Sequence, residues 1–318
     1  MLRTTRRADI LLARACAAAA ACLALGAAPG TGQVAGSAPP FPARVLITND
    51  NGIDDPKVVA LARGFARHAE VWVFAPAAER SGSGSYLTIT RVGAMAAEPR
   101  DLGPGIRAFA VDGFPADCVL LALLGPMKDS PPDLVVSGIN GGANLGSAWF
   151  ASGTVGAART AALAGLPAIA VSGLDDDIPG AVEAAVDWVV RLAASPAVRD
   201  LRAHEFLTVS LPQVAPDSVA GVRVADRAPL RVVPRLEPAG DGSWRVVGSD
   251  ELAGAPPPGS DEAVWNDRFI AIVPMRADEV DFQRLAVWRR LAPGLPAWRQ
   301  TDPGAPAIRK PQGSGLIR

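Results

Sequence analysis

The chain has 318 residues, of which 49% are hydrophobic and 20% are charged, and its formal net charge at pH 7 is −1. This length and composition allow a full hydrophobic core, in one large domain or two small ones. The near-zero charge argues against a protein that binds a nucleic-acid polymer through a strongly basic surface.

The first 38 residues have the pattern of an export signal. Several arginines precede an apolar stretch, Ala15–Ala28, which is shorter than the roughly 20 residues needed to span a bilayer. We therefore expect residues 1–38 to be removed, leaving a periplasmic or secreted protein with no stable membrane insertion. The alternatives are an uncleaved amphipathic anchor and a misassigned start codon, and the latter would make the protein cytoplasmic.

Short apolar runs flanked by Gly, Pro or Ser alternate with helical patterns along the mature chain. Such runs are typical of strands covered on both faces, and the alternation predicts an α/β fold with a doubly wound, mostly parallel sheet. Strands are expected at Val45–Ile47, Val71–Phe74, Leu134–Val136, Ala168–Val171 and Phe206–Leu211, and helices at Pro56–Ala69, Ala116–Leu124, Thr154–Ala164 and Pro179–Leu192.

Two regions break this alternation. Residues 87–111 have no long helical stripe and are expected to form extended segments, as in a hairpin inserted beside the site. Residues 213–262 resemble them, and further strands are expected at Val222–Val224, Arg231–Val233, Trp244–Val247 and Arg268–Val273. Because Pro and Gly dominate from Pro293 onward, we expect one domain at residues 39–292 and a loose tail at 293–318.

Asp50 follows the first strand directly. An Asp in this place often caps the next helix or closes a turn. Here the next helix is expected only from Pro56, and Asp54 and Asp55 are better placed to cap it. Asp50 is therefore free to point into the crevice at the carboxyl ends of the strands, where open α/β sheets bind ligands.

Two later strand ends carry polar side chains to the same edge. Arg80 and the Gly/Ser loop 81–85 follow the second strand; they can approach an anion, although a flexible solvent loop explains this composition more simply. Asn140 ends another strand and Asn144 follows it, where the amides either ligate a metal ion or only support a tight turn. Carboxylate, hydroxyl and amide oxygens together suit a hard divalent cation and its phosphate ligand.

A third feature is the helix that opens with Ser152, Gly153 and Thr154. A helix N-terminus with hydroxyl groups attracts phosphate, although Ser152 is equally natural as a simple N-cap.

The remaining signals are less informative: Asp175–Asp177 is expected to be a solvated helix cap and Cys118 a packed core thiol. The chain lacks a Gly-x-Ser-x-Gly elbow, a P-loop lysine and a dinucleotide fingerprint in its proper context, which argues against a serine hydrolase, a P-loop enzyme and a dehydrogenase.

Taken in order, these motifs resemble the SurE-type survival proteins, a family of 5′/3′-nucleotidases with acid phosphatase activity. The likeness extends over roughly residues 44–275. The matching segments are Ile47-Thr48-Asn49-Asp50, Arg80-Ser81-Gly82, Leu87-Thr88, Pro115-Ala116-Asp117-Cys118-Val119, Ser137-Gly138-Ile139-Asn140, Asn144-Leu145-Gly146, Ser152-Gly153-Thr154-Val155-Gly156-Ala157-Ala158 and Leu166-Pro167-Ala168-Ile169-Ala170-Val171-Ser172.

The resemblance implies a Rossmann-like domain with a β-hairpin extension that assembles as a homodimer or homotetramer. It also implies one Mg²⁺ or Mn²⁺ ion, held at the positions of Asp50, Asn51, Ser81 and Asn140. Asn51 stands where the family has a second Asp, so a negative charge beside the cation is lost. Changes around a metal site cost about 10- to 100-fold in metal affinity, and we expect at least that order here.

We therefore expect a metal-dependent phosphomonoesterase that hydrolyses a small-molecule nucleoside monophosphate. Asp50 is the expected catalytic residue, as metal ligand, base or nucleophile. Arg80, Asn144 and the helix start at Ser152, Gly153 and Thr154 are expected to bind phosphate or substrate. The alternative is an exported nucleotide- or phosphate-binding protein whose catalysis was weakened or lost with the second Asp.

Overall fold

The computed structural model describes residues 41–174, 177–251, 254–279 and 281–291. The chain divides into two compact units, Met1–Asp278 and Glu279–Arg318, and the described part of the second contains helix α8 (Phe282–Leu291). The expected export signal at residues 1–38 and the expected tail at 293–318 lie outside the described residues. Within the described part, no helix is long and apolar enough to cross a membrane.

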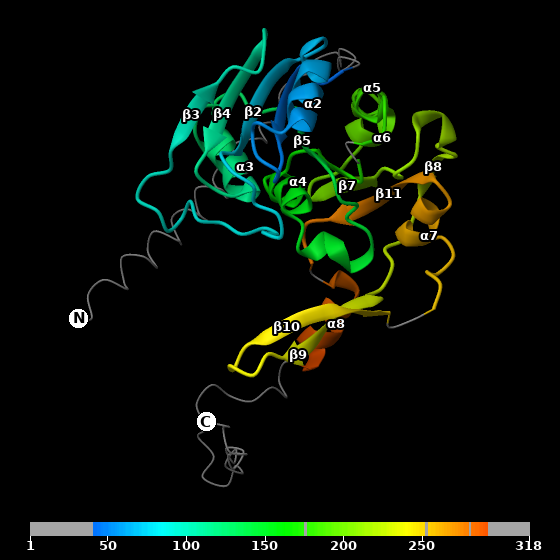
Figure 1. The fold of residues 1–318 in the computed structure, drawn as a ribbon. Coiled ribbons are helices and arrows are strands. Elements are labelled where there is room, and N and C mark those ends of the chain that lie inside the picture. Colours follow the sequence, from blue (N-terminus) through cyan, green and yellow to red (C-terminus); the bar gives the residue numbers. More distant parts are fainter. Residues whose placement is uncertain (1–40, 175–176, 252–253, 280, 292–318) are drawn as a thin grey trace, which may run out of the picture. The chain divides into compact units, whose positions relative to one another are not determined.

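A nine-stranded sheet runs through the described part of the first unit, in the order β3-β4-β2-β1-β5-β6-β7-β11-β8 (Figure 1). Its inner strands pair in parallel, whereas β3–β4 and β7–β11 are antiparallel. This confirms the predicted mostly parallel sheet. The strands are β1 (Arg44–Thr48), β2 (Glu70–Pro76), β3 (Ala97–Arg100), β4 (Ile106–Val111), β5 (Leu134–Asn140), β6 (Ala168–Ser172), β7 (Glu205–Ser210), β8 (Gly221–Val224) and β11 (Phe269–Arg276).

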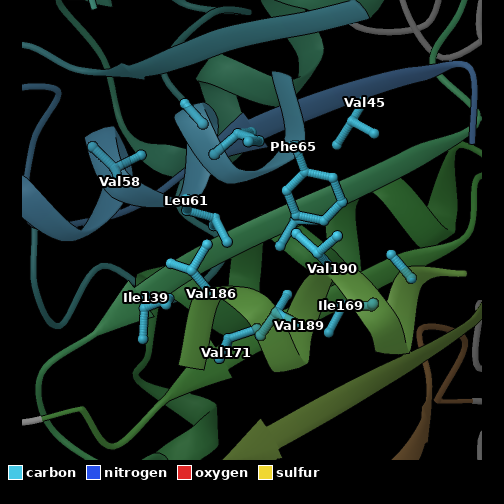
Figure 2. Close-up of a cluster of buried hydrophobic side chains, with 14 of the residues drawn as sticks. Val45, Val58, Leu61, Phe65, Ile139, Ile169, Val171, Val186, Val189 and Val190 are labelled. Atoms are coloured by element: carbon cyan, nitrogen blue, oxygen red, sulfur yellow. The ribbon is translucent and has the colours of Figure 1, made fainter. Parts of the chain in front are cut away.

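Alternate residues of each buried strand point to opposite faces of the sheet, and both faces are apolar. Helices therefore cover both faces. Val45 of β1 packs in one core cluster with α2 and α5, as Figure 2 shows, while its neighbour Leu46 packs in a second cluster with α3 and α4. The helices are α2 (Pro56–Ala66), α3 (Pro115–Leu124), α4 (Gly153–Leu163), α5 (Ala181–Ala193), α6 (Pro196–Arg199) and α7 (Asp261–Asn266), with the 3₁₀ turns η1 (Gly146–Phe150) and η2 (Pro216–Ser218).

Helix α2 begins where its proline and capping residue predict, whereas α5 begins later than predicted. Helix α2 begins at Pro56, and the carboxylate of Asp55 caps it by accepting a hydrogen bond from Lys57 N at 2.7 Å. Helix α5 does not begin at Pro179, so that expectation is wrong. Gly180 takes a left-handed conformation (φ 72°) as the N-cap, and the helix starts one residue later. Asp177 is described in a turn before Gly180, whereas residues 175–176 lie outside the described part.

Both irregular regions contain hairpins. The extended segments expected within residues 87–111 are β3 and β4, but β4 pairs in parallel with β2, so the hairpin widens the main sheet. The antiparallel strands β9 (Val232–Pro238) and β10 (Trp244–Glu251) form a separate two-stranded sheet. This second hairpin is the extension that the family resemblance implied.

Candidate active site

Asp50 lies two residues after the end of β1 and is 3% exposed. Its carboxylate accepts two hydrogen bonds from the first turn of α4: Oδ1 from Thr154 Oγ1 at 2.6 Å, and Oδ2 from Thr154 N at 3.0 Å. At Gly153, an added Cβ would lie 2.9 Å from Asp50 Cβ and 2.6 Å from Ser83 Oγ. The end of β1, the loop after β2 and the start of α4 therefore meet at Asp50.

The environment of Asp50 shifts its ionisation. Burial raises the pKa of Asp50, because desolvation disfavours the charged form, and the hydrogen bonds from Thr154 act in the opposite direction. The carboxylate of Glu79 also raises the pKa of Asp50 by repulsion. A cation beside Asp50 would oppose both effects, because it would favour the charged form.

Buried polar atoms without partners mark the loops around this carboxylate. Asn51 Oδ1, Ser83 Oγ and Asn144 Nδ2 are buried and make no hydrogen bond within the described residues. They follow β1, β2 and β5, respectively. Because most buried polar groups in proteins are hydrogen-bonded, these exceptions are candidates for ligand contacts.

The loop after β2 is tied to Asp50 through its backbone. Arg80 N donates to the carbonyl oxygen of Asp50 at 2.7 Å. The Arg80 guanidinium turns toward the segment before α3: its Cζ lies 5.2 Å from the centre of the Phe114 ring, and its Nη2 lies 3.8 Å from Asp112 Oδ1. Ser81 is exposed, and its N–H donates to Glu79 Oε1 at 2.5 Å. The structure thus gives Arg80 protein partners, and its contact with phosphate stays a prediction.

Asn140 is the last residue of β5, which pairs in parallel with β1, so Asn140 and Asp50 leave the same edge of adjacent strands. Its Nδ2 donates to Gly142 O at 2.6 Å, which fixes the amide. Asn144 is 9% exposed, and its backbone N–H donates to Ser172 Oγ at 3.2 Å. The two asparagines thus lie on one loop with defined geometry.

At the start of α4, the hydroxyl groups of Ser152 and Thr154 both make hydrogen bonds within the protein. Ser152 is the N-cap, and its Oγ accepts from Val155 N at 3.1 Å, while Thr154 holds Asp50. The positive end of the helix faces the Asp50 carboxylate through the Thr154 N–H. The capping alternative for Ser152 is therefore observed, and phosphate binding by Ser152, Gly153 and Thr154 stays a prediction.

No hydrogen bond joins the side chains of Asp50, Asn51, Ser81 and Asn140 directly in the described part of the chain, and their role as a shared metal site also stays a prediction. Among the described residues, no three His, Cys, Asp or Glu side chains form a metal-binding group.

Sequence reasoning missed a buried carboxylate that supports the site. Asp117 in the first turn of α3 is 0% exposed and accepts hydrogen bonds from Thr88 N, Thr88 Oγ1, Ile89 N and Phe114 N, at 2.8 to 3.0 Å. It holds the segment that follows the Gly/Ser loop against α3. An Asp two residues after a helix-opening proline is a signal that points to such a cap.

The comparisons agree with this architecture. Residues 45–232 match the family model described as "Survival protein SurE". The chain belongs to the SurE family. It is 38% identical over 252 residues to the 5′-nucleotidase SurE of Roseobacter denitrificans, covering 74% of this chain and 94% of that protein. It is 37% identical over 256 residues to the 5′-nucleotidase SurE of Desulfatibacillum aliphaticivorans, covering 77% of this chain and 98% of that protein.

A solved structure extends the likeness to three dimensions. The crystal structure of the SurE protein from Aquifex aeolicus aligns with a TM-score of 0.65 and 25% identity, over 78% of this chain and 99% of the other. The match to the sequence model of the family ends at residue 232, so α7 lies outside the matched residues.

Proposed function

We propose that this SurE protein hydrolyses phosphate monoesters, with nucleoside 5′-monophosphates as its substrates. The observation that carries the proposal is the buried carboxylate of Asp50, which stands at the carboxyl-end edge of the parallel sheet against the N-terminus of α4. Strand-end crevices of this kind bind phosphate-bearing ligands, and helix N-termini favour anions. The names of the relatives, 5′-nucleotidase SurE, point to the same reaction.

The residues present fit one divalent metal ion. Asn51 Oδ1 is a buried acceptor without a partner, and it lies next in sequence to a carboxylate whose pKa burial raises. Asp50, Asn51, Ser81 and Asn140 would hold the ion, and such oxygen donors suit Mg²⁺ or Mn²⁺. When bound, the ion polarises a phosphoryl oxygen and lowers the pKa of a water molecule.

The chain's own side chains would bind and orient the ester. Asn144 Nδ2 is a buried donor without an acceptor, which suits an anionic phosphoryl oxygen. Thr154 fixes both oxygens of Asp50, so this carboxylate keeps one orientation while the substrate binds. Arg80 would add positive charge at the rim, where its guanidinium is only partly buried. Donors placed in advance where charge develops lower the barrier without reorganisation.

A panel of substrates tests the proposal. The metal-stripped protein is assayed for phosphate release from 5′- and 3′-nucleotides, ribose 5-phosphate and p-nitrophenyl phosphate, before and after Mn²⁺ or Mg²⁺ is added. We expect release that depends on the metal and a preference for 5′-nucleotides. Equal release without metal would contradict the metal site, and no release from any monoester would contradict the proposed function.

The asparagine at position 51 supports a second candidate, a nucleotide- or phosphate-binding protein without turnover. Asn51 supplies a neutral oxygen where the resemblance implies a carboxylate, so a cation is held more weakly. The Asn51→Asp variant separates the two candidates. An inert wild type with an active Asn51→Asp variant would favour the binding protein, whereas turnover by the wild type favours the enzyme.

Compartment and assembly belong to the same proposal. The leader at residues 1–38 supports export to the periplasm or medium, and the family resemblance supports a homodimer or homotetramer. N-terminal sequencing of the natively expressed protein would identify the mature start. Light scattering at several concentrations would give the oligomer, and a monomer at every concentration would contradict the assembly.

A further inference from the structure

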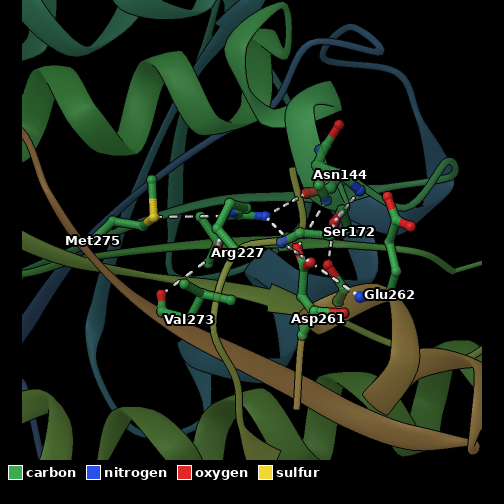
Figure 3. Close-up of polar contacts among 12 residues, drawn as sticks. Asn144, Ser172, Arg227, Asp261, Glu262, Val273 and Met275 are labelled. Atoms are coloured by element: carbon green, nitrogen blue, oxygen red, sulfur yellow. Dashed lines mark hydrogen bonds and ion pairs between the residues drawn. The ribbon is translucent and has the colours of Figure 1, made fainter. Parts of the chain in front are cut away.

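The partly buried Arg227 and the buried Asp261 form an ion pair near the Asn140–Gly146 loop (Figure 3). Arg227 Nη1 lies 2.8 Å from Asp261 Oδ2, and the Asp261 side chain is 1% exposed. Asp261 is the first residue of α7, and its Oδ1 also accepts hydrogen bonds from Ala228 N and Glu262 N at 2.9 and 3.0 Å. The Asp261 carboxylate is thus also bound to the backbone of Ala228, the residue after Arg227, and of Glu262, the residue after Asp261.

Both members of the pair also hold the backbone of the asparagine loop. Arg227 Nη1 donates to the carbonyl oxygen of Asn144 at 2.8 Å, and Asp261 Oδ2 accepts from Gly146 N at 2.9 Å. With the bond from Asn144 N to Ser172 Oγ, both backbone polar groups of Asn144 are engaged. The backbone on either side of the Asn144 side chain is therefore clamped.

The clamped side chain is the one whose donor has no partner. Asn144 is 9% exposed, and its Nδ2 makes no hydrogen bond within the described residues. An unpaired buried donor costs free energy unless a ligand oxygen meets it. Glu262, the neighbour of Asp261, lies so close to Gly146 that an added Cβ there would meet its Oε1. A side chain of α7 therefore lies against the loop at Gly146.

We propose that Arg227 and Asp261 are positioning residues, which hold the loop so that Asn144 Nδ2 meets a non-bridging oxygen of the phosphate monoester. The proposal rests on the proposed function and adds a part of the chain to it. Asp261 is distant in sequence from Gly146 and lies beyond the span matched by the family model. The segment after β8 thus completes the site.

The attraction between the two charges adds little net stability, because desolvating both groups offsets most of it. An ion pair whose charged groups each bond the loop backbone instead fixes distances and angles. Small displacements of a group that contacts the reacting centre reduce turnover strongly, by about 100-fold for 1 Å. The geometry therefore predicts a loss of turnover in the folded protein, in addition to any loss of stability.

The test compares Asp261→Asn with Thr208→Val in the full-length protein. Thr208 is a buried residue of β7 that accepts a hydrogen bond from Arg227 Nη2 at 2.6 Å, on the nitrogen that does not reach the loop. Thr208→Val therefore weakens the surroundings of Arg227 while both loop contacts remain. The variants are measured for Tm, for kcat and KM with a 5′-nucleotide and Mn²⁺, and for amide hydrogen exchange in the peptide that contains residues 144–146.

We expect Asp261→Asn to lower kcat by about 10- to 100-fold with KM changed less than about threefold, since the lost alignment acts mainly in the transition state. Exchange at residues 144–146 should rise in this variant. Thr208→Val should also lower Tm, by less than the removal of a charge in Asp261→Asn, while keeping kcat and the slow exchange. If Asp261→Asn does not fold, Arg227→Met combined with Asp261→Asn removes both charges, leaves neither unpaired, and should show the same kcat loss.

Two outcomes would overturn the inference. A folded Asp261→Asn variant with wild-type kcat would do so, as would losses of kcat that follow Tm equally in Asp261→Asn and Thr208→Val. Failure of the proposed function gives a different result, because the wild type itself would then release no phosphate from any monoester.

Discussion

Thr154 donates both its hydroxyl and its backbone N–H to the two carboxylate oxygens of Asp50, at 2.6 and 3.0 Å. These residues are 104 positions apart in the sequence, at the end of β1 and the start of α4. The contact gives a buried carboxylate a fixed orientation at the positive end of a helix. The proposed chemistry depends on this orientation.

Thr154→Val should weaken this contact while the backbone bond remains. Removing a hydrogen bond to a buried charged group costs about 1.5–3 kcal/mol, so the free energy of unfolding should fall by that order and kcat should fall as well. Thr160→Val is the matched control, because Thr160 is buried on the same helix and its Oγ1 bonds Gly156 O instead. Urea unfolding and steady-state kinetics measure both variants, and equal kcat in the two would contradict the role of Thr154.

Gly156→Ala should disrupt the packing of α4 against the Gly/Ser loop. An added Cβ at Gly156 would meet the carbonyl oxygen of Gly84, which is backbone and cannot move aside cheaply. Overpacking of this kind costs about 1–3 kcal/mol. Gly93→Ala is the control, since nothing lies within 4 Å of its added Cβ, and its stability should stay within about 0.5 kcal/mol of the wild type. Thermal unfolding measures both variants. Equal Tm values would show that Gly156 and the backbone of Gly84 are not in close contact.

The thiol of Cys118 should make stability depend on alkaline pH. Cys118 is 0% exposed, and burial raises its pKa, with repulsion from Asp117 adding to the shift. At pH values below the ordinary thiol pKa, the folded and unfolded states both keep the proton. At higher pH, the unfolded state loses it first, so the free energy of unfolding should fall by about 1.4 kcal/mol per pH unit from this group.

Cys118→Ala removes that contribution. In urea titrations between about pH 8 and 10, the wild type should lose stability more steeply than the variant, because the ordinary thiol pKa is about 8.5. Parallel curves for the two proteins would contradict the raised pKa.

Asn51→Asp should strengthen cation binding. It places a second carboxylate beside Asp50, and charge at a metal site changes the affinity by about 10- to 100-fold. Calorimetry with Mn²⁺ alone measures the change in Kd without relying on turnover. Gln283→Glu, on the exposed surface of α8, adds the same charge as a control and should leave Kd unchanged. Equal Kd values in wild type and Asn51→Asp would remove Asn51 from the metal site.

The sequence predicted those parts of the site that follow buried strands. Short apolar runs located β1, β2 and β5, and the parallel order placed Asp50 and Asn140 at one edge, because the carboxyl ends of such strands coincide. Local capping chemistry offered Asp54 or Asp55 as the cap of α2, of which Asp55 is observed, and Ser152 as the N-cap of α4.

The remaining features depend on contacts that no local pattern encodes. Asp261 bonds Gly146 across 115 positions, and Arg227 reaches Asn144 across 83. Neither residue lies in a periodic segment or a known motif, and a lone Arg or Asp is most often a solvated surface residue. The start of α5 was missed for a local reason, since Gly180 adopts a left-handed conformation that residue type permits but does not require.

The most direct test of the account is kcat/KM for a nucleoside 5′-monophosphate with Mn²⁺ in Asp50→Asn, with Asp54→Asn as the exposed control on the same loop. Asp50→Asn keeps the shape of the side chain and removes its charge, so we predict a loss of at least about 100-fold, as for other groups that stabilise a transition state. Asp54→Asn should remain near the wild type. Wild-type kcat/KM in Asp50→Asn would contradict the account at its centre.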